Sequence, residues 1–366
     1  MNVLIASPWL HPHGGGLERY AWSIGRELAR AGHEVTLLGH AREPVDETRE
    51  RVRVVGVAPR RTLSNTPLSL EVHRVARRLA RDADVVNVHT PVPGTAELVA
   101  LAARRAGVPH VVTYHAGTLG APAGILRAAA SVHRALGERW LLRGAAARIA
   151  VSPYVAARVF GRLASEVVPP GVDAERFAPQ GEPVPGRVLF VGPVSRAYAW
   201  KGFAVLADAF ERLAQRVPEA HLRVVGQGDL VESYRARFAG RPVTFVGRVE
   251  EAQLVREYSR ASVVVLPSIT DAESFGMCLA EANACARPVV ASAIGGIPSF
   301  VRDGDNGLLV PAGEPEALAQ ALERLLADST LASRLGARGR ERVLKEHRWD
   351  ALAEKTASLL AQASTR

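Results

Sequence analysis

The sequence predicts an α/β protein built from two doubly wound domains, each with a parallel sheet covered by helices. Strand-like apolar runs alternate with helical segments along the whole chain, which is typical of parallel sheets. The 366 residues exceed the roughly 250–300 beyond which a single core seldom grows. Pro169-Pro170-Gly171 cannot continue a strand ladder and marks a linker between two series of strands. We therefore expect one domain over residues 1–170 and another over 171–348.

The first domain begins with a buried strand directly at Met1 and repeats the strand and helix rhythm from there. Each expected strand is a short, Val-rich or Ile-rich run, and each expected helix is a longer segment that separates two such runs. The expected strands are Val3–Ala6, Val35–Leu38, Val52–Val57, Val85–Val88, Val108–Thr113 and Ala147–Val151. The expected helices are Leu17–Ala31, Leu70–Arg81, Leu98–Ala106 and Leu126–Arg143.

The second domain repeats the same pattern after the linker. Its expected strands are Val188–Val191, Leu222–Val225, Val243–Val246, Val263–Leu266, Val289–Ala291 and Leu308–Val310. The last helix, about Trp349–Ala363, has no strand left to join, so we expect residues 349–366 to cross back to the first domain. Ligands of doubly wound sheets lie off the carboxyl ends of the strands, and two facing sheets would share one cleft.

Composition indicates a globular chain with an ample core. Apolar residues make up 48% and charged residues 23%, and no apolar run approaches the roughly 18 residues that a spanning helix needs. The N-terminus lacks the basic start and cleavage site of a signal peptide. Cys278 and Cys285 lie on one predicted helix, roughly 10 Å apart and beyond disulfide reach. We expect a reduced, cytoplasmic protein.

The net charge of +9 comes from arginine, which is most frequent in the first half of the chain. Such a surface could contact phosphate groups or an anionic membrane, and the alternative is an ordinary solvated basic surface. The basic segment Leu126–Arg143, with Trp140 near its end, could rest on a membrane that carries an acceptor. We expect no nucleic-acid partner, and a location at the inner membrane face would be peripheral.

Glu273 and Glu281 are the most informative pair of residues in the chain. They bracket a Gly-containing turn and the start of a helix near Gly276, whose first backbone N–H groups and positive dipole end would form an anion site. One carboxylate precedes the helix and the other lies inside it, so they would reach different parts of one ligand, such as a nucleotide diphosphate sugar. The alternative is an ordinary helix with an acidic residue near its start.

The motifs, taken in order, resemble the retaining glycosyltransferases of family four, and the resemblance covers nearly the whole chain. In the first half it rests on Gly14-Gly15-Gly16-Leu17-Glu18-Arg19, Gly32-His33-Glu34-Val35, Tyr114-His115, Ser152-Pro153-Tyr154 and Pro169-Pro170-Gly171-Val172-Asp173. In the second half it rests on Arg196 with Lys201-Gly202, Val225-Gly226-Gln227-Gly228, Val246-Gly247-Arg248, the Glu273 to Glu281 block and Gly295-Gly296. The resemblance implies the GT-B architecture, in which two Rossmann-like domains face each other across a cleft.

The resemblance also implies roles for individual side chains. Arg196 and Lys201 would bind the donor diphosphate, and their charges suit a leaving nucleotide. Glu281 would bind the ribose hydroxyls, Glu273 would lie beside the transferred sugar, and His115 would face that sugar from the first domain. Taken alone, Lys201 could be a surface lysine at a turn and His115 a structural histidine.

Further positions would contribute through backbone or close approach. The resemblance implies that backbone N–H groups of the segment after Glu273 reach sugar hydroxyls and phosphates, namely those of Phe275, Gly276, Met277, Cys278 and Leu279. Gly15 and Gly16 would let the chain approach the diphosphate, although three glycines could also be only a flexible loop. Val249 lies in a loop expected near the base, where the sequence leaves guanine and uracil both open.

The chain departs from the family pattern in two places. The family usually has its arginine directly after the strand-ending glycine, whereas Pro193-Val194-Ser195 separate Gly192 from Arg196 here. Pro298-Ser299 stands where the family commonly has Pro-Glu, so one carboxylate often found near the donor is missing. Because the loop before Arg196 is longer than the family's, the sequence leaves the direction of the Arg196 side chain open.

The expected reaction transfers a hexose from a GDP-linked or UDP-linked donor to an acceptor hydroxyl with retention, by front-face attack in which the leaving phosphate takes the acceptor proton. Acceptors of this architecture dock mainly on the first domain.

We expect no cofactor and no metal, because the Asp-x-Asp matches at Asp82 and Asp303 are short enough to arise by chance. A nicotinamide dehydrogenase is disfavoured because G-x-G-x-x-G is absent after the first strand. A sugar-nucleotide epimerase or phosphorylase, or a non-enzymatic nucleotide-sugar-binding protein, remains the alternative.

Overall fold

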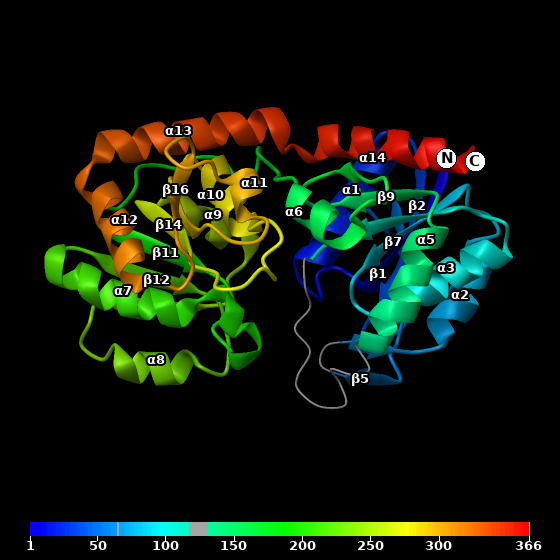
Figure 1. Ribbon diagram of the computed structural model, residues 1–366, viewed down its shortest axis with the longest axis horizontal. Coiled ribbons are helices and arrows are strands. Elements are labelled where there is room, and N and C mark those ends of the chain that lie inside the picture. Colours follow the sequence, from blue (N-terminus) through cyan, green and yellow to red (C-terminus); the bar gives the residue numbers. More distant parts are fainter. Residues whose placement is uncertain (64–65, 117–130, 366) are drawn as a thin grey trace. The chain divides into compact units, whose positions relative to one another are not determined.

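The computed structural model describes residues 1–63, 66–116 and 131–365 of the chain. It divides into two compact units, one made of Met1–Pro170 with Trp349–Arg366 and the other of Gly171–Arg348, here called unit 1 and unit 2. Each unit is a twisted, largely parallel sheet flanked by helices (Figure 1). The predicted α/β class with two Rossmann-like sheets is confirmed.

The sheet of unit 1 has the strand order β10-β9-β8-β7-β1-β2-β4-β3 within the described residues. Its strands are β1 (Asn2–Trp9), β2 (Glu34–His40), β3 (Val45–Arg49), β4 (Val52–Val57), β7 (Val85–Thr90), β8 (His110–Tyr114), β9 (Ala147–Ala150) and β10 (Glu166–Val167). All neighbours pair in parallel except β3, which is antiparallel to β4. Because β1 pairs with both β2 and β7, the strand order reverses between β1 and β7.

Helices cover the sheet of unit 1 and include the end of the chain. They are α1 (Gly16–Arg30), α2 (Glu71–Leu79), α3 (Thr95–Arg105), the π-helical turn η1 (Arg134–Glu138), α5 (Arg139–Gly144), α6 (Pro153–Val155), the π-helical turn η2 (Ala156–Phe160) and α14 (Trp349–Ser364). Tyr20, Ile24 and Leu28 recur every four residues on the buried side of α1. α14 packs against α1 (Figure 1) and buries Leu352 and Leu360, so the last helix contributes to the core of unit 1.

In the residues that it describes, the structure adds four strands to those expected in unit 1, namely β3, the two-residue β10, β5 (Arg61–Leu63) and β6 (Thr66–Leu68). β3 has one apolar residue among five and lies at the exposed antiparallel edge, where a polar strand gives no apolar run to detect. β5 and β6 form a separate short antiparallel pair. The helix expected over 126–143 is helical from 131 onward, with a π-helical turn at η1, and its first five residues lie outside the described ranges.

The sheet of unit 2 is fully parallel, with the order β13-β12-β11-β14-β15-β16. Its strands are β11 (Arg187–Val191), β12 (His221–Val225), β13 (Val243–Gly247), β14 (Val263–Leu266), β15 (Val289–Ser292) and β16 (Gly307–Val310), and all six expected strands are confirmed. They are continuous apolar runs because both faces of a parallel sheet are covered. In the register, Phe190 is paired with Val224 on one side and Val265 on the other.

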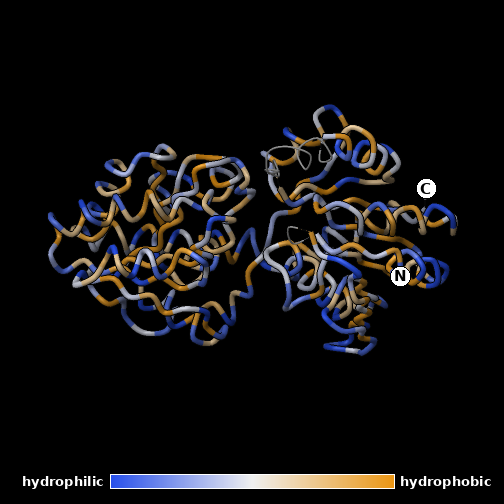
Figure 2. The backbone as a smooth tube through the Cα atoms, turned by 90° about the horizontal axis from the view of Figure 1, so that it is seen from below, coloured by the Kyte–Doolittle hydropathy of each residue, from blue (hydrophilic) through white to orange (hydrophobic). Residues whose placement is uncertain are grey.

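Two layers of helices enclose the sheet of unit 2. They are the 3₁₀ turn η3 (Arg196–Lys201), α7 (Phe203–Arg216), α8 (Val231–Arg237), α9 (Glu251–Ser259), α10 (Met277–Ala284), α11 (Ile297–Phe300), α12 (Pro315–Ala327) and α13 (Ser329–Glu346). Phe190 packs into one core with residues of α7 and α12, while the adjacent Leu189 packs into a second core with residues of α9 and α10. Hydrophobic segments accordingly run through the interior of each unit (Figure 2).

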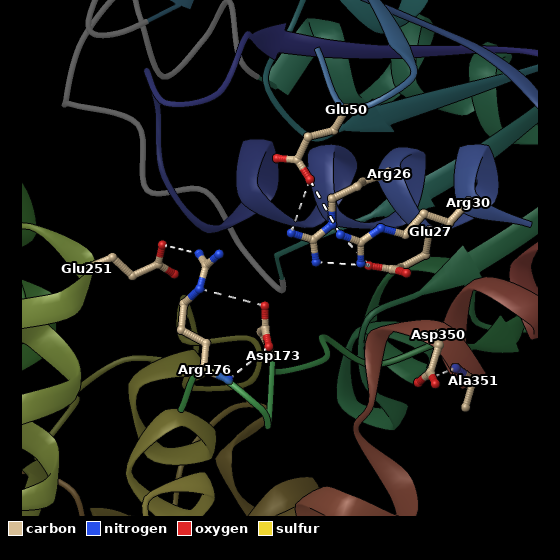
Figure 3. A network of polar contacts seen from close by, with 9 residues as sticks. All are labelled: Arg26, Glu27, Arg30, Glu50, Asp173, Arg176, Glu251, Asp350 and Ala351. Atoms are coloured by element: carbon tan, nitrogen blue, oxygen red, sulfur yellow. Dashed lines mark hydrogen bonds and ion pairs between the residues drawn. The ribbon is translucent and has the colours of Figure 1, made fainter. Parts of the chain in front are cut away.

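Ion pairs link side chains on the surface of each unit. In unit 1, Arg26 and Arg30 of α1 contact Glu27 and Glu50 (Figure 3). In unit 2, Arg176 contacts both Asp173, just after the linker, and Glu251 at the start of α9. The pairs with half-exposed side chains, such as Arg176 with Glu251, contribute about 0–1 kcal/mol each. Within the described ranges, no helix is both long enough and apolar enough to span a membrane.

Candidate functional site

The strand order of unit 2 brings two loops together where it reverses. β11 pairs with β12 on one side and β14 on the other, so the loops after β11 and β14 leave the sheet in different directions at its carboxyl edge. A gap of this kind is where doubly wound sheets bind ligands. Lys201 lies in the loop after β11 and Glu273 in the loop after β14, and Nζ of Lys201 is 2.9 Å from Oε2 of Glu273.

Glycines hold these loops in close contact. Gly202 follows Lys201 with φ +73°, and a Cβ there would overlap the carbonyl oxygen of Pro267. The N–H of Ile269 donates to the carbonyl of Trp200 at 2.8 Å, which joins the two loops directly. These backbone contacts fix Lys201 relative to the end of β14.

The surroundings of Lys201 keep its ammonium charged. Burial acts to lower the pKa of Lys201, but the charge of Glu273 and the hydrogen bond to it raise the pKa above its ordinary value. The Nζ atom also lies 4.5 Å from the centroid of the Trp200 ring. Ser268 donates its hydroxyl to the same Glu273 oxygen at 3.3 Å. A fixed, partly buried cation at strand ends is suited to bind an anion.

The helix that follows Glu273 begins as the sequence predicts. Gly276 adopts a left-handed conformation with φ +86°, and α10 starts at the next residue. The first-turn N–H groups of α10 therefore lie at the carboxyl edge of the sheet, near the end of β14. Glu281 lies in the middle of α10, only 4% exposed, and accepts a hydrogen bond from the Tyr258 hydroxyl at 2.7 Å.

The predicted backbone contributors differ in what their side chains do. The ring of Phe275 packs against Phe300 at 5.2 Å and the side chain of Leu279 is fully buried, so neither side chain can reach a ligand. The N–H of Leu279 already donates to the carbonyl of Gly276 at 2.9 Å. Cys278 lies beside Lys201, and burial raises the pKa of its thiol to about 12. Val249, after β13, is half-buried against the same core as α10.

Arg196 is not brought to the Lys201 and Glu273 pair. Its side chain is 79% exposed, and its guanidinium contacts Oδ2 of Asp229 at 3.0 Å. The backbone N–H of Arg196 also donates to Oδ1 of Asp229 at 3.0 Å. The longer loop before Arg196 therefore directs its side chain toward the loop after β12, where Asp229 holds it.

In unit 1, the glycine-rich loop carries its own carboxylate. Gly15 caps α1, and its N–H donates to Oε2 of Glu18 at 2.7 Å. Glu18 is buried, and this burial raises the pKa of its carboxyl group. A Cβ on Gly15 would meet open space, and Gly16 is the first residue of α1. One N–H group at this helix start is thus already satisfied by the chain itself.

His115 lies just after β8 in a cluster of rings. Its Nε2 is 2.8 Å from Nδ1 of His89, the two imidazoles stack at 5.0 Å, and Tyr20 meets His115 edge-on at 4.9 Å. Burial lowers the pKa of His89 to about 3, and burial together with the neighbouring His89 lowers the pKa of His115 well below its ordinary value. Both rings are therefore neutral near pH 7.

The acidic pairs that resembled metal motifs have structural partners. Oδ2 of Asp84 accepts from the N–H of Asn2 at 2.7 Å, and Oδ1 of Asp303 accepts from the N–H of Leu309 at 2.9 Å. Asp305 forms an ion pair with Arg338. Across the part of the chain that the structure describes, no group of three His, Cys, Asp or Glu side chains could hold a metal ion.

Sequence reasoning missed several residues of the site. Tyr258 lies on the buried side of α9 and His89 lies inside a buried strand, while Ser268 and Asp229 lie in loops outside the quoted motifs. The one usable signal was position, because His89 is a polar residue at the carboxyl end of an apolar strand.

The chain matches two protein-family models. Residues 14–176 match the model described as Glycosyltransferase Family 4, and residues 185–328 match the model described as Glycosyl transferases group 1. Among curated relatives, a GDP-mannose-dependent alpha-(1-6)-phosphatidylinositol monomannoside mannosyltransferase of Mycobacterium tuberculosis is 32% identical, covering 98% of each chain. A phosphatidyl-myo-inositol mannosyltransferase of Mycolicibacterium smegmatis is 31% identical, covering 96% of this chain and 90% of the relative.

Solved structures share the fold. The sucrose-phosphate synthase of Thermosynechococcus elongatus is 25% identical with a TM-score of 0.77, covering 99% of this chain and 98% of that one. HepE of Anabaena, solved with UDP and glucose, is 20% identical with a TM-score of 0.79, covering 99% of each chain. At that identity the likeness to HepE bears on the fold alone. Together with the family models and curated relatives, these matches show that the chain belongs to the group 1 glycosyltransferases of family 4, as a hexosyltransferase that uses a nucleotide-sugar donor.

Proposed function

We propose that the chain is a retaining, metal-independent hexosyltransferase whose unit 2 binds the donor nucleotide at the carboxyl edge of its sheet. The observation that carries the proposal is the buried ion pair between Lys201 and Glu273, placed where the strand order reverses and beside the start of α10. A fixed cation and a helix N-terminus together suit a diphosphate. Glu273 would contact the transferred sugar of the donor, and Glu281 would contact its ribose.

Each site residue has a role that its surroundings support. Lys201 binds the diphosphate with the first-turn N–H groups of α10, including those of Met277 and Cys278. Glu281, one turn further along the helix, accepts hydrogen bonds from the ribose hydroxyls. Glu273 accepts a hydrogen bond from a hydroxyl of the transferred sugar, and its contact with Lys201 brings that sugar next to the phosphate that Lys201 binds.

Arg196 has a conditional role in this scheme. In the structure it is tied to Asp229 and largely exposed, so it joins the diphosphate only after leaving that carboxylate. An exposed pair of this kind contributes about 0–1 kcal/mol, which a phosphate contact readily replaces. Arg196 therefore closes over a bound donor, whereas Lys201 is in place before binding.

The reaction breaks the bond between the anomeric carbon and the departing phosphate oxygen and forms a bond from the acceptor oxygen on the same face of the sugar. The acceptor proton passes to the leaving phosphate. Lys201 and the N–H groups of α10 stabilise the charge that develops on the diphosphate, which is usually the largest contribution to such catalysis. His115, held neutral beside His89, contacts the sugar as a hydrogen-bonding group rather than a cation. Full activity in a strong chelator is the expected result.

The donor and acceptor classes follow from the relatives. The mycobacterial proteins that are 32% identical are named for GDP-mannose and for phosphatidylinositol mannosides, so we expect GDP-mannose as donor and an inositol-containing lipid as acceptor. With such an acceptor, we propose that the enzyme works in the cytoplasm, peripheral to the inner membrane face.

A basic cavity in unit 1 supports contact with an anionic lipid. It has a volume of ≈520 Å³ beside η1, α5 and η2. Its lining combines three arginines with one glutamate, a serine and apolar residues, namely Arg134, Arg139, Arg143, Glu138, Ser131, Ala135, Leu142, Val159 and Leu163. Leu136, 68% exposed, lies on the same turn of helix. Cationic and apolar groups side by side suit a lipid headgroup and the start of its acyl chains.

Calorimetric titration with GDP and UDP tests the donor site. We expect micromolar binding of GDP and weaker binding of UDP by the full chain. Lys201→Ala should lose this binding and Glu281→Ala should weaken it, while Arg212→Ala, on the outer surface of α7, should retain it. Binding of neither nucleotide by the folded chain would contradict the proposal, and tighter binding of UDP would contradict the GDP assignment.

Vesicle co-sedimentation tests the membrane contact. The chain should bind vesicles that contain phosphatidylinositol at low salt and release them as salt rises, because the attraction is electrostatic. Arg139→Glu with Arg143→Glu should abolish this binding, whereas the charge-matched change of Arg212 and Arg324 to Glu in unit 2 should not. Equal binding by both double variants would place the contact elsewhere.

A further inference from the structure

The hydroxyl of Tyr258 reaches the carboxylate of Glu281 inside the core of unit 2. Tyr258 is the penultimate residue of α9 and Glu281 lies in the middle of α10, so this contact joins two helices. The hydroxyl donates to Oε2 at 2.7 Å. Tyr258 is fully buried and Glu281 is 4% exposed. A hydrogen bond to an ionised carboxylate is roughly twice as strong as one between neutral groups.

The position of this hydroxyl is set by packing. The Tyr258 ring meets the ring of Phe177 edge-on at 6.0 Å and belongs to the same buried core as Val255 and Leu279. A ring enclosed in this way has one position, so its hydroxyl points to one place. The bond consequently restrains the plane of the Glu281 carboxylate about its last bond.

Glu281 lies next to the proposed diphosphate site along α10. Cys278 and Glu281 are three residues apart and therefore share one face of the helix. The carboxylate held by Tyr258 is thus one helical turn from the group proposed to hold the phosphates.

We infer that Tyr258 is a positioning residue that orients Glu281 toward the donor ribose and makes the site selective for ribose over 2′-deoxyribose. This inference rests on the proposed role of Glu281. A ribose presents adjacent 2′ and 3′ hydroxyls, and a carboxylate of fixed orientation accepts from both. When one hydroxyl is absent, a buried acceptor loses its partner, and the site rejects the analogue.

The experiment compares ribose and deoxyribose ligands on the full chain. Dissociation constants are measured by calorimetry for GDP and 2′-deoxy-GDP, and for UDP and 2′-deoxy-UDP. The proteins are wild type, Tyr258→Phe, Glu281→Gln and the double variant. The wild type should prefer the ribose form by about tenfold or more, which is the effect of one hydrogen bond to a charged group. Tyr258→Phe should reduce this preference to about two- to threefold, and Glu281→Gln should abolish it. The double variant should match Glu281→Gln alone.

A matched control separates positioning from general loss of a hydroxyl. Tyr234→Phe removes a tyrosine hydroxyl from the opposite face of the same sheet, and it should leave the ribose preference unchanged. Thermal unfolding of each variant shows whether the ring alone maintains the core. If Tyr258→Phe does not fold, Glu281→Asp replaces it, because the shorter carboxylate keeps its charge but loses the Tyr258 contact.

Two results would overturn the inference, and they are distinguishable. An unchanged ribose preference in Tyr258→Phe, or in Glu281→Asp where that variant is used, with loss of preference in Glu281→Gln, would show that Tyr258 does not position the carboxylate. An unchanged preference in Glu281→Gln would show that Glu281 does not bind the ribose, and the proposed donor site would then be wrong at that residue.

Discussion

The pair formed by Lys201 and Glu273 combines a structural and a chemical role in the same two side chains. Both are largely buried, with 18% and 9% of the side chains exposed. Removing one member of a buried pair leaves the other charge without compensation, which costs about 3–5 kcal/mol. Replacing both by neutral groups of similar size avoids that cost. Stability and activity should therefore respond differently to single and double substitutions.

We predict that Lys201→Met lowers the free energy of unfolding by about 3 kcal/mol and lowers kcat by about 10²–10³. The double variant Lys201→Met with Glu273→Gln should regain most of the stability, because no buried charge is left unpaired, while kcat stays low. Denaturant unfolding and steady-state kinetics measure the two effects. Normal kcat in either variant would restrict Lys201 to a structural role.

The histidines of unit 1 predict a pH dependence of stability. Burial lowers the pKa of His89 to about 3 in the folded chain, whereas an unfolded histidine has a pKa of about 6.5. As the pH falls below about 6.5, the unfolded state binds a proton that the folded state does not, so stability is lost on acidification. Between pH 7 and pH 5, His89 alone accounts for about 2 kcal/mol of that loss.

His89→Gln should reduce this slope, because glutamine does not titrate. The measurement is denaturant unfolding at pH 7 and pH 5, monitored by tryptophan fluorescence. Trp349, which packs against Tyr20, reports on unit 1. His13→Gln, an exposed histidine of the same unit, is the control and should leave the slope unchanged. An equal slope in wild type and His89→Gln would show that His89 is already protonated or accessible in the folded chain.

Single residues of the site differ in how far sequence could locate them. Lys201, Glu273 and Glu281 lie in recognisable motifs, so their roles were expected. The ion pair between Lys201 and Glu273 depends on which strands are neighbours, and the local sequence does not determine the strand order. Tyr258 lies in the polar helix α9, where a tyrosine gives no separate signal, and His89 could be located only by its position near the carboxyl end of an apolar strand. Arg196 was expected beside Lys201, yet the structure pairs it with Asp229, because the longer loop changes its direction.

At the scale of elements, the parallel strands were the most predictable part of the fold. Both faces of such strands are buried, so each is a continuous apolar run, and β4 and β14 coincide with the expected residues. The polar edge strand β3 lacks this signal. Loop geometry at the site could not be predicted either, because it depends on contacts between loops that are more than sixty residues apart, such as Trp200 and Ile269.

The loop contact at Gly202 gives a prediction with a closely matched control. Gly202 and Gly240 both have φ +73°, but a Cβ on Gly202 would overlap the carbonyl of Pro267, whereas a Cβ on Gly240 would meet open space. Gly240→Ala should cost about 1 kcal/mol from backbone strain alone. Gly202→Ala should cost about 1–3 kcal/mol more, because the two loops must separate.

Gly202→Ala and Gly240→Ala should also differ in their effect on ligand affinity. Moving the loop after β11 away from β14 shifts Lys201 from Glu273, so Gly202→Ala should weaken nucleoside diphosphate binding by about tenfold or more, and Gly240→Ala should not. Calorimetry on both variants measures this. Equal affinities would mean that the loop contact does not position Lys201.

For the whole molecule, the chain path makes the two units unequal. The chain passes between the units at Pro170–Gly171 and again at Arg348–Trp349, so unit 2 is one continuous segment while unit 1 needs both ends of the chain. Unit 2 has its own two-layer core and contains Lys201, Glu273 and Glu281. Unit 1 buries Trp349 and Leu360 of α14 in its core.

Residues 171–348 expressed alone should therefore fold cooperatively and bind the nucleoside diphosphate within about threefold of the full chain. Residues 1–170 alone should not fold stably, because losing buried side chains such as Leu360 costs about 2–5 kcal/mol each, a large part of a domain's stability. Thermal unfolding and calorimetry measure both, and Lys201→Ala within the 171–348 segment checks that binding uses the same site. A folded 171–348 segment that binds far more weakly than the full chain would assign part of the diphosphate affinity to unit 1, where Gly15 and Gly16 are the first residues to test.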